Sequence, residues 1–206
     1  MRILHTSDWH LGRTFHGRVL DDAQAIFADH LVELARTEAV DAVVISGDVY
    51  DRAIPPTDSV LLLDDTLRRL VGATRVVLTP GNHDSAQRLG FGAGLMRRGL
   101  AIRTRTAEVD RPVIIPTPDG GDGLYVYALP YLDPDRQSLP PLLADRLGES
   151  PETPEPTSDG GGPDPGSVDS GDDAGSSPPP QAASYRLPRS HEAVVSGALR
   201  LVAADL

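Results

Sequence analysis

The feature that most constrains this fold is the alternation of short β-branched runs with helical segments in the first half of the chain. Residues 42–46 form a continuous apolar run of the kind found in strands that are covered on both faces. Helical spacing is seen from Asp21 to Thr37, and a second helix is expected to start at Pro55-Pro56-Thr57. The expected strands are residues 2–6, 42–46 and 75–79. Strands that alternate with helices predict an α/β fold with a mostly parallel, layered sheet flanked by helices.

The expected face of the first helix is set by its apolar residues. The positions with helical spacing are Ala23, Phe27, Leu31, Leu34 and Ala35. The signals weaken after Gly99, where residues 113–115 and 124–129 are expected to form a hairpin around the turn Pro118-Asp119-Gly120-Gly121. Residues 189–206 regain helical spacing.

A segment of unusual composition separates that last helix from the rest. Residues 149–184 are rich in Pro, Gly, Ser and Asp, and Val168 is their only large apolar residue. Such a segment cannot offset its ordering entropy, so we expect a disordered acidic linker. The predicted organisation is a core domain over residues 1–148, a linker over 149–184, and a helix over 185–206 that continues the core domain.

The charge of the chain is unevenly distributed. The net charge is -11, but eight acids and no base lie in residues 149–184. Without these eight, 22 of the 30 acids remain against 19 basic residues, all of which are Arg. Residues 85–105 carry no acid and five arginines, which are Arg88, Arg97, Arg98, Arg103 and Arg105. A local basic patch on an acidic protein is therefore expected.

The absence of cysteine and of long apolar runs limits the chemistry and the location. With no Cys, a metal ion would have to use Asp, His, Asn or Glu, and a disulfide scaffold is excluded. No run of about 18 apolar residues exists, and the start of the chain is too polar for a signal peptide. We expect a soluble, cytoplasmic protein that has no membrane partner.

Three polar clusters follow the three expected strands. They are Asp8-Trp9-His10, Gly47-Asp48-Val49-Tyr50-Asp51 and Gly81-Asn82-His83-Asp84. In open α/β sheets, ligands bind at the carboxyl ends of the strands. Mixed oxygen and nitrogen donors suit Mn, Fe or Zn better than Ca or Mg. The glycines that precede Asp48 and Asn82 let the backbone turn sharply and approach a bound ion or phosphate.

The series Asp-x-His, Gly-Asp-x-x-Asp and Gly-Asn-His-Asp resembles that of the calcineurin-like metallophosphoesterases, over roughly residues 1–135. The resemblance implies a cofactor of two divalent metal ions, with Mn as the first choice. It implies that Asp8 and His10 bind one ion, that Asp48 bridges both, and that Asn82 binds the second.

The resemblance also implies two catalytic residues. His83 would be the imidazole beside the scissile phosphate, where it stabilises or protonates the leaving oxygen. Asp84 would orient His83 by accepting its other ring proton.

One departure from the family pattern concerns histidine. The family takes further His ligands from later Gly-His and Gly-His-x-His segments, whereas the only His after His83 is His191, in neither context. The second ion would then be held by Asp48 and Asn82 alone. We expect a fragment of a longer protein in preference to a truncated, inactive product, and little activity from this chain alone.

The resemblance favours a nuclease within the family, since the opening residues 1–13 and the basic segment 85–105 fit a DNA substrate. It implies a DNA phosphodiesterase acting on DNA ends with an SMC-like ATPase, as a homodimer within a heterotetramer. Two alternatives stay open. One is a small-molecule or protein phosphatase of the same superfamily, and the other is a non-catalytic fragment that keeps only fold and partner contacts.

For several other residues we favour a structural role over a functional one. Trp9 is expected to pack rather than to stack on a base, Asp51 to stabilise its loop rather than to bind metal, and His5 to form a hydrogen bond in the core. Four arginines could contact DNA phosphates or form a solvated face, and these are Arg52, Arg88, Arg97 and Arg98.

Overall fold

The computed structural model describes residues 1–96, 99–117, 119–121, 123–136, 139–148 and 187–206. The linker predicted over residues 149–184 lies outside the described residues, as do Arg97, Arg98 and Pro118. In the described part of the chain, no helix combines the length and the apolar character that a membrane span needs.

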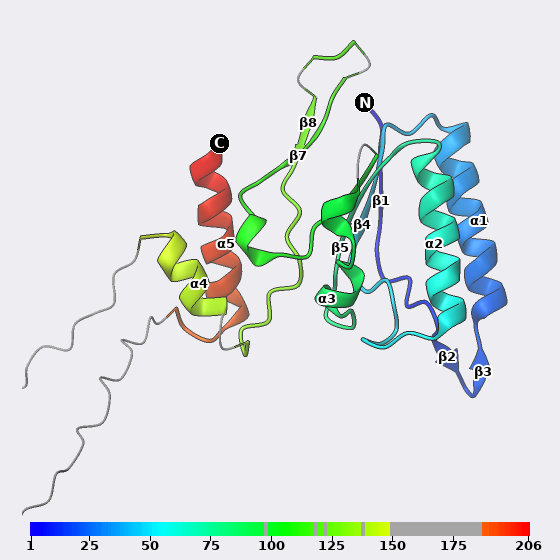
Figure 1. Ribbon diagram of the computed structural model, residues 1–206, viewed down its shortest axis with the longest axis horizontal. Coiled ribbons are helices and arrows are strands. Elements are labelled where there is room, and N and C mark those ends of the chain that lie inside the picture. Colours follow the sequence, from blue (N-terminus) through cyan, green and yellow to red (C-terminus); the bar gives the residue numbers. More distant parts are fainter. Residues whose placement is uncertain (97–98, 118, 122, 137–138, 149–186) are drawn as a thin grey trace, which may run out of the picture.

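The centre of the fold is a four-stranded parallel sheet in the order β1-β4-β5-β6 (Figure 1). Strand β1 covers Ile3–Thr6, β4 covers Ala42–Ser46, β5 covers Arg75–Thr79 and β6 covers Leu100–Ile102. The three predicted strands are confirmed, and the mostly parallel α/β architecture with them. Strand β6 was not predicted, because only three residues form it and only one of them is β-branched.

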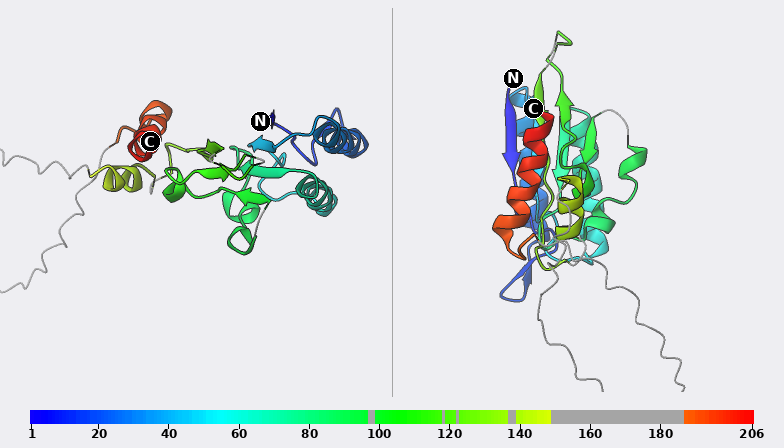
Figure 2. Two further views of the ribbon diagram at one scale, coloured as in Figure 1. Left: turned by 90° about the horizontal axis from the view of Figure 1, so that it is seen from above. Right: turned by 90° about the vertical axis from the view of Figure 1, so that its left-hand side faces the viewer.

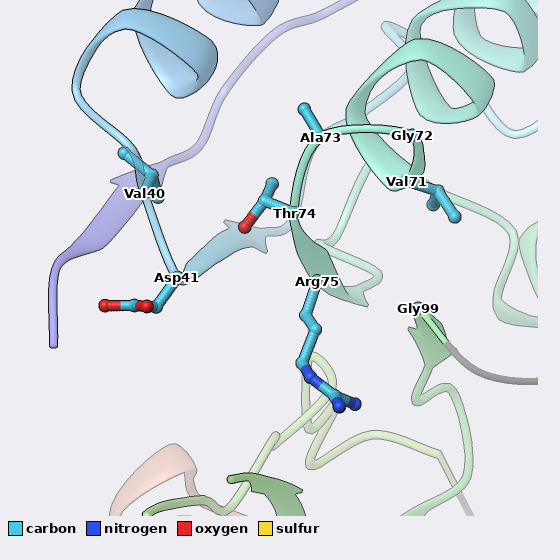
Figure 3. A pocket seen from close by; sticks show the side chains of 8 residues that line it. All are labelled: Val40, Asp41, Val71, Gly72, Ala73, Thr74, Arg75 and Gly99. Atoms are coloured by element: carbon cyan, nitrogen blue, oxygen red, sulfur yellow. The ribbon is translucent and has the colours of Figure 1, made fainter. Parts of the chain in front are cut away.

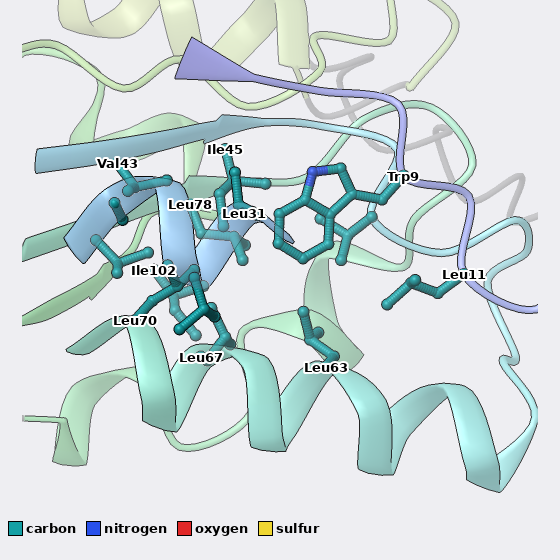
Figure 4. Close-up of a cluster of buried hydrophobic side chains, with 14 of the residues drawn as sticks. Trp9, Leu11, Leu31, Val43, Ile45, Leu63, Leu67, Leu70, Leu78 and Ile102 are labelled. Carbon is teal, nitrogen blue, oxygen red and sulfur yellow. The ribbon is translucent and has the colours of Figure 1, made fainter. Parts of the chain in front are cut away.

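Two helices cover one face of this sheet. Helix α1 spans Asp21–Thr37 and α2 spans Thr57–Val71, as predicted. Alternate strand residues point to opposite faces, so Ile45 and Leu78 pack against the helices with Leu70 of α2. Figure 4 shows this cluster, with Trp9 at the end nearest the loops that follow the strands. The helices thereby hold those strand ends in a fixed position.

Helix α1 is rotated from the face that its apolar spacing predicts. The buried residues are Gln24, Ala28, Leu31, Val32 and Ala35. Phe27 is 38% exposed and packs edge-on against Trp9, with ring centroids 5.6 Å apart. The prediction that Ala23 and Phe27 belong to the buried face is wrong. The helix instead turns the polar side chain of Gln24 inward, where it binds the backbone of the loop that follows β1.

The other face of the sheet is covered by a β-hairpin. Strands β7, Val113–Ile115, and β8, Leu124–Val126, pair antiparallel, with Ile114 opposite Tyr125. Ile115 packs against Ala42 and Val77, which alternate with the strand residues that face the helices. The predicted hairpin is confirmed, although β8 ends at Val126 rather than at residue 129.

Beyond the hairpin lies a pair of helices, α4 and α5. Helix α4 covers Leu139–Arg146, which the sequence did not predict, and α5 covers His191–Asp205, close to the prediction. Leu143 of α4 packs with Val194 and Ala198 of α5. Figures 1 and 2 show the resulting order of layers, from α1 and α2 through the sheet and the hairpin to α4 and α5.

Short elements occupy the loops at the carboxyl ends of the strands. They are β2 (Thr14–Phe15), β3 (Arg18–Val19), α3 (Ala86–Leu89) and η2 (Thr106–Glu108). A further short helix, η1 (Ala93–Leu95), lies in the connection from β5 to β6.

Candidate metal centre

The loops that follow β1, β4 and β5 are joined to one another by backbone hydrogen bonds. The amide of Asp8 donates to the carbonyl of Gly47 at 3.1 Å, and the amide of His10 donates to the carbonyl of Asp48 at 2.9 Å. The amide of Gly47 in turn donates to the carbonyl of Thr79 at 3.0 Å. The parallel sheet brings the three polar clusters to one edge, and this ladder fixes their relative positions.

Three of the predicted metal ligands have a left-handed backbone. The φ angle is 58° at Asp8, 45° at His10 and 49° at Asp48. Non-glycine residues rarely adopt such angles, and each costs on the order of 1 to 3 kcal/mol. The surrounding hydrogen bonds offset that cost. The pairing of the strands does not require left-handed residues at these positions. Backbone strain that is concentrated at a few residues is typical of a functional site.

Two glycines allow the β4 and β5 loops to touch. A Cβ atom added to Gly81 would lie 2.1 Å from Oδ1 and 2.3 Å from the backbone nitrogen of Asp48. A Cβ added to Gly47, whose φ is 82°, would lie 2.8 Å from the Cα of Gly81. Only glycine fits at either position. The glycines that were expected to let the backbone approach an ion or phosphate thus bring the two loops against each other, with Asp48 beside the loop of Asn82 and His83.

The side-chain donors are spaced as ligands of a shared ion would be. Nε2 of His10 lies 3.8 Å from Oδ1 of Asp8 and 4.0 Å from Oδ2 of Asp48, too far for hydrogen bonds. Donor atoms of His10, Asp48 and His83 all lie within 4.8 Å of one another. Metal–ligand bonds of about 2.0 to 2.2 Å allow two ligands of one ion to stand up to about 4.4 Å apart. The separations of His10 from Asp8 and from Asp48 lie within this limit, so these donors fit a shared divalent metal.

His83 is held by the loop that follows β4. Its backbone N–H donates to Oδ1 of Asp48 at 3.0 Å, and its ring Nδ1 lies 2.9 Å from the carbonyl oxygen of Asp51. A carbonyl can only accept, so Nδ1 carries the proton of this bond and Nε2 is the second ring nitrogen. The bond to Asp51, with the charges of Asp48 and Asp51, raises the pKa of His83 above its ordinary value of 6.5. The ring stands edge-on to that of His10, with centroids 4.8 Å apart.

Asp84 does not have the partner that we predicted. Its carboxylate accepts three backbone N–H bonds, from Val49 at 3.0 Å, Tyr50 at 2.9 Å and Gly81 at 2.9 Å. The prediction that Asp84 accepts the ring proton of His83 is therefore wrong. Both carboxylate oxygens face the backbone of the β4 loop, and Asp84 joins that loop to the β5 loop.

Two residues that support the site were not predicted to do so. Gln24 is buried, and it accepts from the amide of Gly12 at 3.0 Å and donates to the carbonyl of His10 at 2.7 Å. The sequence did offer a signal for Gln24, because this polar residue lies on the same side of helix α1 as Ala28 and Leu31. The carbonyl of Asp51, which binds His83, had no signal because every residue carries a backbone carbonyl.

The remaining predicted residues lie as follows. Asn82 is exposed in the loop after β5, and Trp9 is buried and donates to Thr6 Oγ1 at 3.0 Å, which favours packing. Oδ1 of Asp51 lies 3.5 Å from the buried Nδ1 of His10. His5 is exposed rather than in the core, and its Nε2 lies 2.9 Å from Ser46 Oγ. Its side of edge strand β1 stays open to solvent.

A cavity of about 430 Å³ lies at the opposite edge of the sheet, at the amino ends of β4 and β5. Figure 3 shows Asp41 and Arg75 on its wall. The carboxylate of Asp41 accepts from the backbone amide of Arg2 at 2.6 Å. This cavity is separated from the cluster of donors by the length of the strands.

Comparison with known protein families agrees with the donor set. The family model described as Calcineurin-like phosphoesterase matches residues 1–156. The chain belongs to this family. As a calcineurin-like phosphoesterase it is a metal-dependent hydrolase of phosphate esters, and the loops after β1, β4 and β5 form its candidate metal centre.

Proposed function

We propose that this calcineurin-like phosphoesterase is a DNA phosphodiesterase of the SbcD type, the nuclease subunit of the bacterial SbcCD exonuclease. The observation that carries the proposal is the joint placement of Asp8, His10 and Asp48 at metal-sharing distances with the ring of His83 beside them. The sequence context supports the SbcD type, since residues 1–12, Gly47-Asp48-Val49-Tyr50-Asp51 and Gly81-Asn82-His83-Asp84-Ser85 resemble that protein.

The residues would divide the metal ligation between them. Asp8 and His10 would hold one ion, Asp48 would bridge, and Asn82 would hold the second, with Mn favoured by the mixed donors. When bound, two such ions lower the pKa of a shared water and neutralise charge on the attacking and leaving oxygens. The backbone N–H of His83 donates to Oδ1 of Asp48 at 3.0 Å and would help to orient this carboxylate for bridging.

His83 would supply the proton. Its Nδ1 is engaged by the carbonyl of Asp51, so Nε2 is the atom that can donate to the leaving sugar oxygen. General acid assistance of this kind contributes about 10² to 10⁴ in rate.

The proposed partners follow from the assignment to the SbcD type. We propose that the chain acts on DNA ends with an SbcC-type SMC-like ATPase, as a homodimer within a heterotetramer. A phosphatase of the same family is the alternative enzyme, and a non-catalytic fragment is the alternative outside catalysis. The alternatives differ in which substrate, if any, is hydrolysed.

The test compares two substrates in the presence of Mn²⁺ and imidazole, where free imidazole replaces the His ligands that the family takes from later segments. We expect cleavage of end-labelled DNA that requires both additions and is lost in Asp48→Asn. Hydrolysis of p-nitrophenyl phosphate without DNA cleavage would favour the phosphatase. Metal binding without either activity would favour the non-catalytic fragment.

A further inference from the structure

A groove of about 580 Å³ is lined by segments that follow β5 and β6, the strands whose carboxyl ends lie at the edge of the candidate metal centre. One wall is α3, which begins two residues after Asp84, and the other walls are the segment after β6 and helix α4. Strand β6 is parallel to β5, so the segment after it leaves the sheet at the same edge as the metal ligands. Neighbouring strands lie about 4.8 Å apart, which places the β6 loop about 10 Å along this edge from the β4 loop.

The polar lining of the groove suits a phosphate chain. Arg105 and Arg136 contribute two guanidinium groups, Thr104 and Thr106 contribute hydroxyls, and Gln87 contributes an amide. None of the described residues that line the groove carries a carboxylate. On a chain with a net charge of -11, such a lining is a local exception. Hydroxyl, amide and guanidinium groups are those that proteins use to contact phosphate oxygens.

Acids stand near both arginines, since Asp133 and Asp135 precede Arg136, and Asp135 pairs with Arg189 at 3.3 Å. Arg105 is 77% exposed and lies 3.7 Å from Glu108, an ion pair on the surface. Exposed pairs of this kind are worth about 0 to 1 kcal/mol, so the guanidinium can exchange this partner for a phosphate at little cost.

The groove also has an apolar wall. Leu139 and Leu142 of α4 line it opposite the polar groups of α3 and the β6 loop. A phosphate ion would gain nothing from such a wall. A nucleotide strand presents phosphates on one side and bases and sugars on the other, which matches the two kinds of lining.

We infer that this groove binds a single strand of DNA and leads it to the metal centre, so that the enzyme acts within a polynucleotide rather than on a small phosphate ester. The inference deepens the proposed function and rests on it for the identity of the strand. The two arginines contact successive phosphates, and the leucines contact the bases or sugars between them.

The experiment measures binding of a fluorescein-labelled oligothymidylate by fluorescence anisotropy in EDTA, with salt varied from 50 to 200 mM. The test protein is the double variant R105Q/R136Q. The matched control is R36Q/R68Q, which removes the same charge from exposed positions on α1 and α2. Circular dichroism and thermal unfolding check that both variants are folded.

For single strands, each phosphate contact adds about 0.7 to the salt dependence of log affinity. Loss of two contacts should lower the slope by about 1.4, so raising salt fourfold should weaken the wild type about sevenfold more than the groove variant. The control should keep the wild-type slope. An unchanged slope in the groove variant, or an equal loss in the control, would overturn the inference.

Two further arms identify the ligand. Inorganic phosphate at the same phosphate concentration should not displace the labelled oligonucleotide. Displacement equal to that by unlabelled oligonucleotide would reveal a site for small anions and overturn the inference that the groove binds a strand. An oligouridylate that bound more tightly through the same arginines would reassign the groove to RNA and overturn the DNA strand. Because binding is measured without metal, loss of the groove contacts is distinguishable from failure of the DNA cleavage test.

Discussion

Replacing Asp84 by Ala tests whether this residue acts on the catalytic histidine or on the backbone. The carboxylate accepts three N–H bonds, from Val49, Tyr50 and Gly81, and all three are partly buried. Hydrogen bonds to a charged group contribute about 1.5 to 3 kcal/mol when buried, and water that enters this partly exposed site offsets some of that loss. At about 1 kcal/mol for each bond, Asp84→Ala should lower the free energy of unfolding by about 3 kcal/mol.

The assay is thermal unfolding in EDTA, so that metal affinity does not contribute. For a domain of this size, 1 kcal/mol corresponds to about 2 to 4 °C, and Asp84→Ala should lower the Tm by about 6 to 12 °C. The control is Asp65→Ala on α2, where the lost group is an exposed ion pair with Arg69, and its Tm should change little.

A second variant separates the two roles further. If Asp84 acted only through His83, Asp84→Ala combined with His83→Ala would be no less stable than His83→Ala alone. Because the three bonds of Asp84 go to backbone amides and not to His83, the double variant should be less stable than His83→Ala alone. A Tm for Asp84→Ala equal to that of Asp65→Ala would show that the three backbone bonds of Asp84 do not stabilise the fold.

Four further outcomes are expected, the first two for a complete protein that carries the later His ligands of the family. Asp48→Asn should lose bound Mn more completely than His10→Ala in metal analysis, because a bridging carboxylate serves both ions, and full two-metal occupancy in the Asp48 variant would contradict this. His83→Ala should keep Mn affinity in a calorimetric titration while losing about 10² to 10⁴ in phosphodiester cleavage, whereas weakened affinity would identify His83 as a ligand. Gly81→Ala should weaken Mn binding, since the added Cβ lies 2.1 Å from Oδ1 of Asp48 and must displace it; wild-type affinity would count against the described contact. The chain without added imidazole should bind at most one ion weakly and cleave no DNA, and robust Mn-dependent cleavage would disprove the account of the absent histidines.

The parallel sheet and the loops that carry the site could both be predicted from local patterns in the sequence. Strands β4 and β5 and helix α1 have the predicted bounds, because their apolar runs and helical spacing are local properties of the chain. The placement of Asp8, His10, Asp48 and His83 was also predictable, since each comes directly after a strand or within its loop. A parallel sheet can only place such loops at one edge.

The tertiary structure decided what each side chain touches. Asp84 is adjacent to His83 in the sequence, yet it binds the backbone of Val49 and Tyr50, because the contact of the two glycine loops brings those amides within reach. Asp51 orients the ring of His83 through a carbonyl that any residue would have. Spacing along a chain predicts which groups come near a site. Hydrogen-bond direction and the close approach of separate loops arise only when the strands are paired and the backbone donors have found their acceptors.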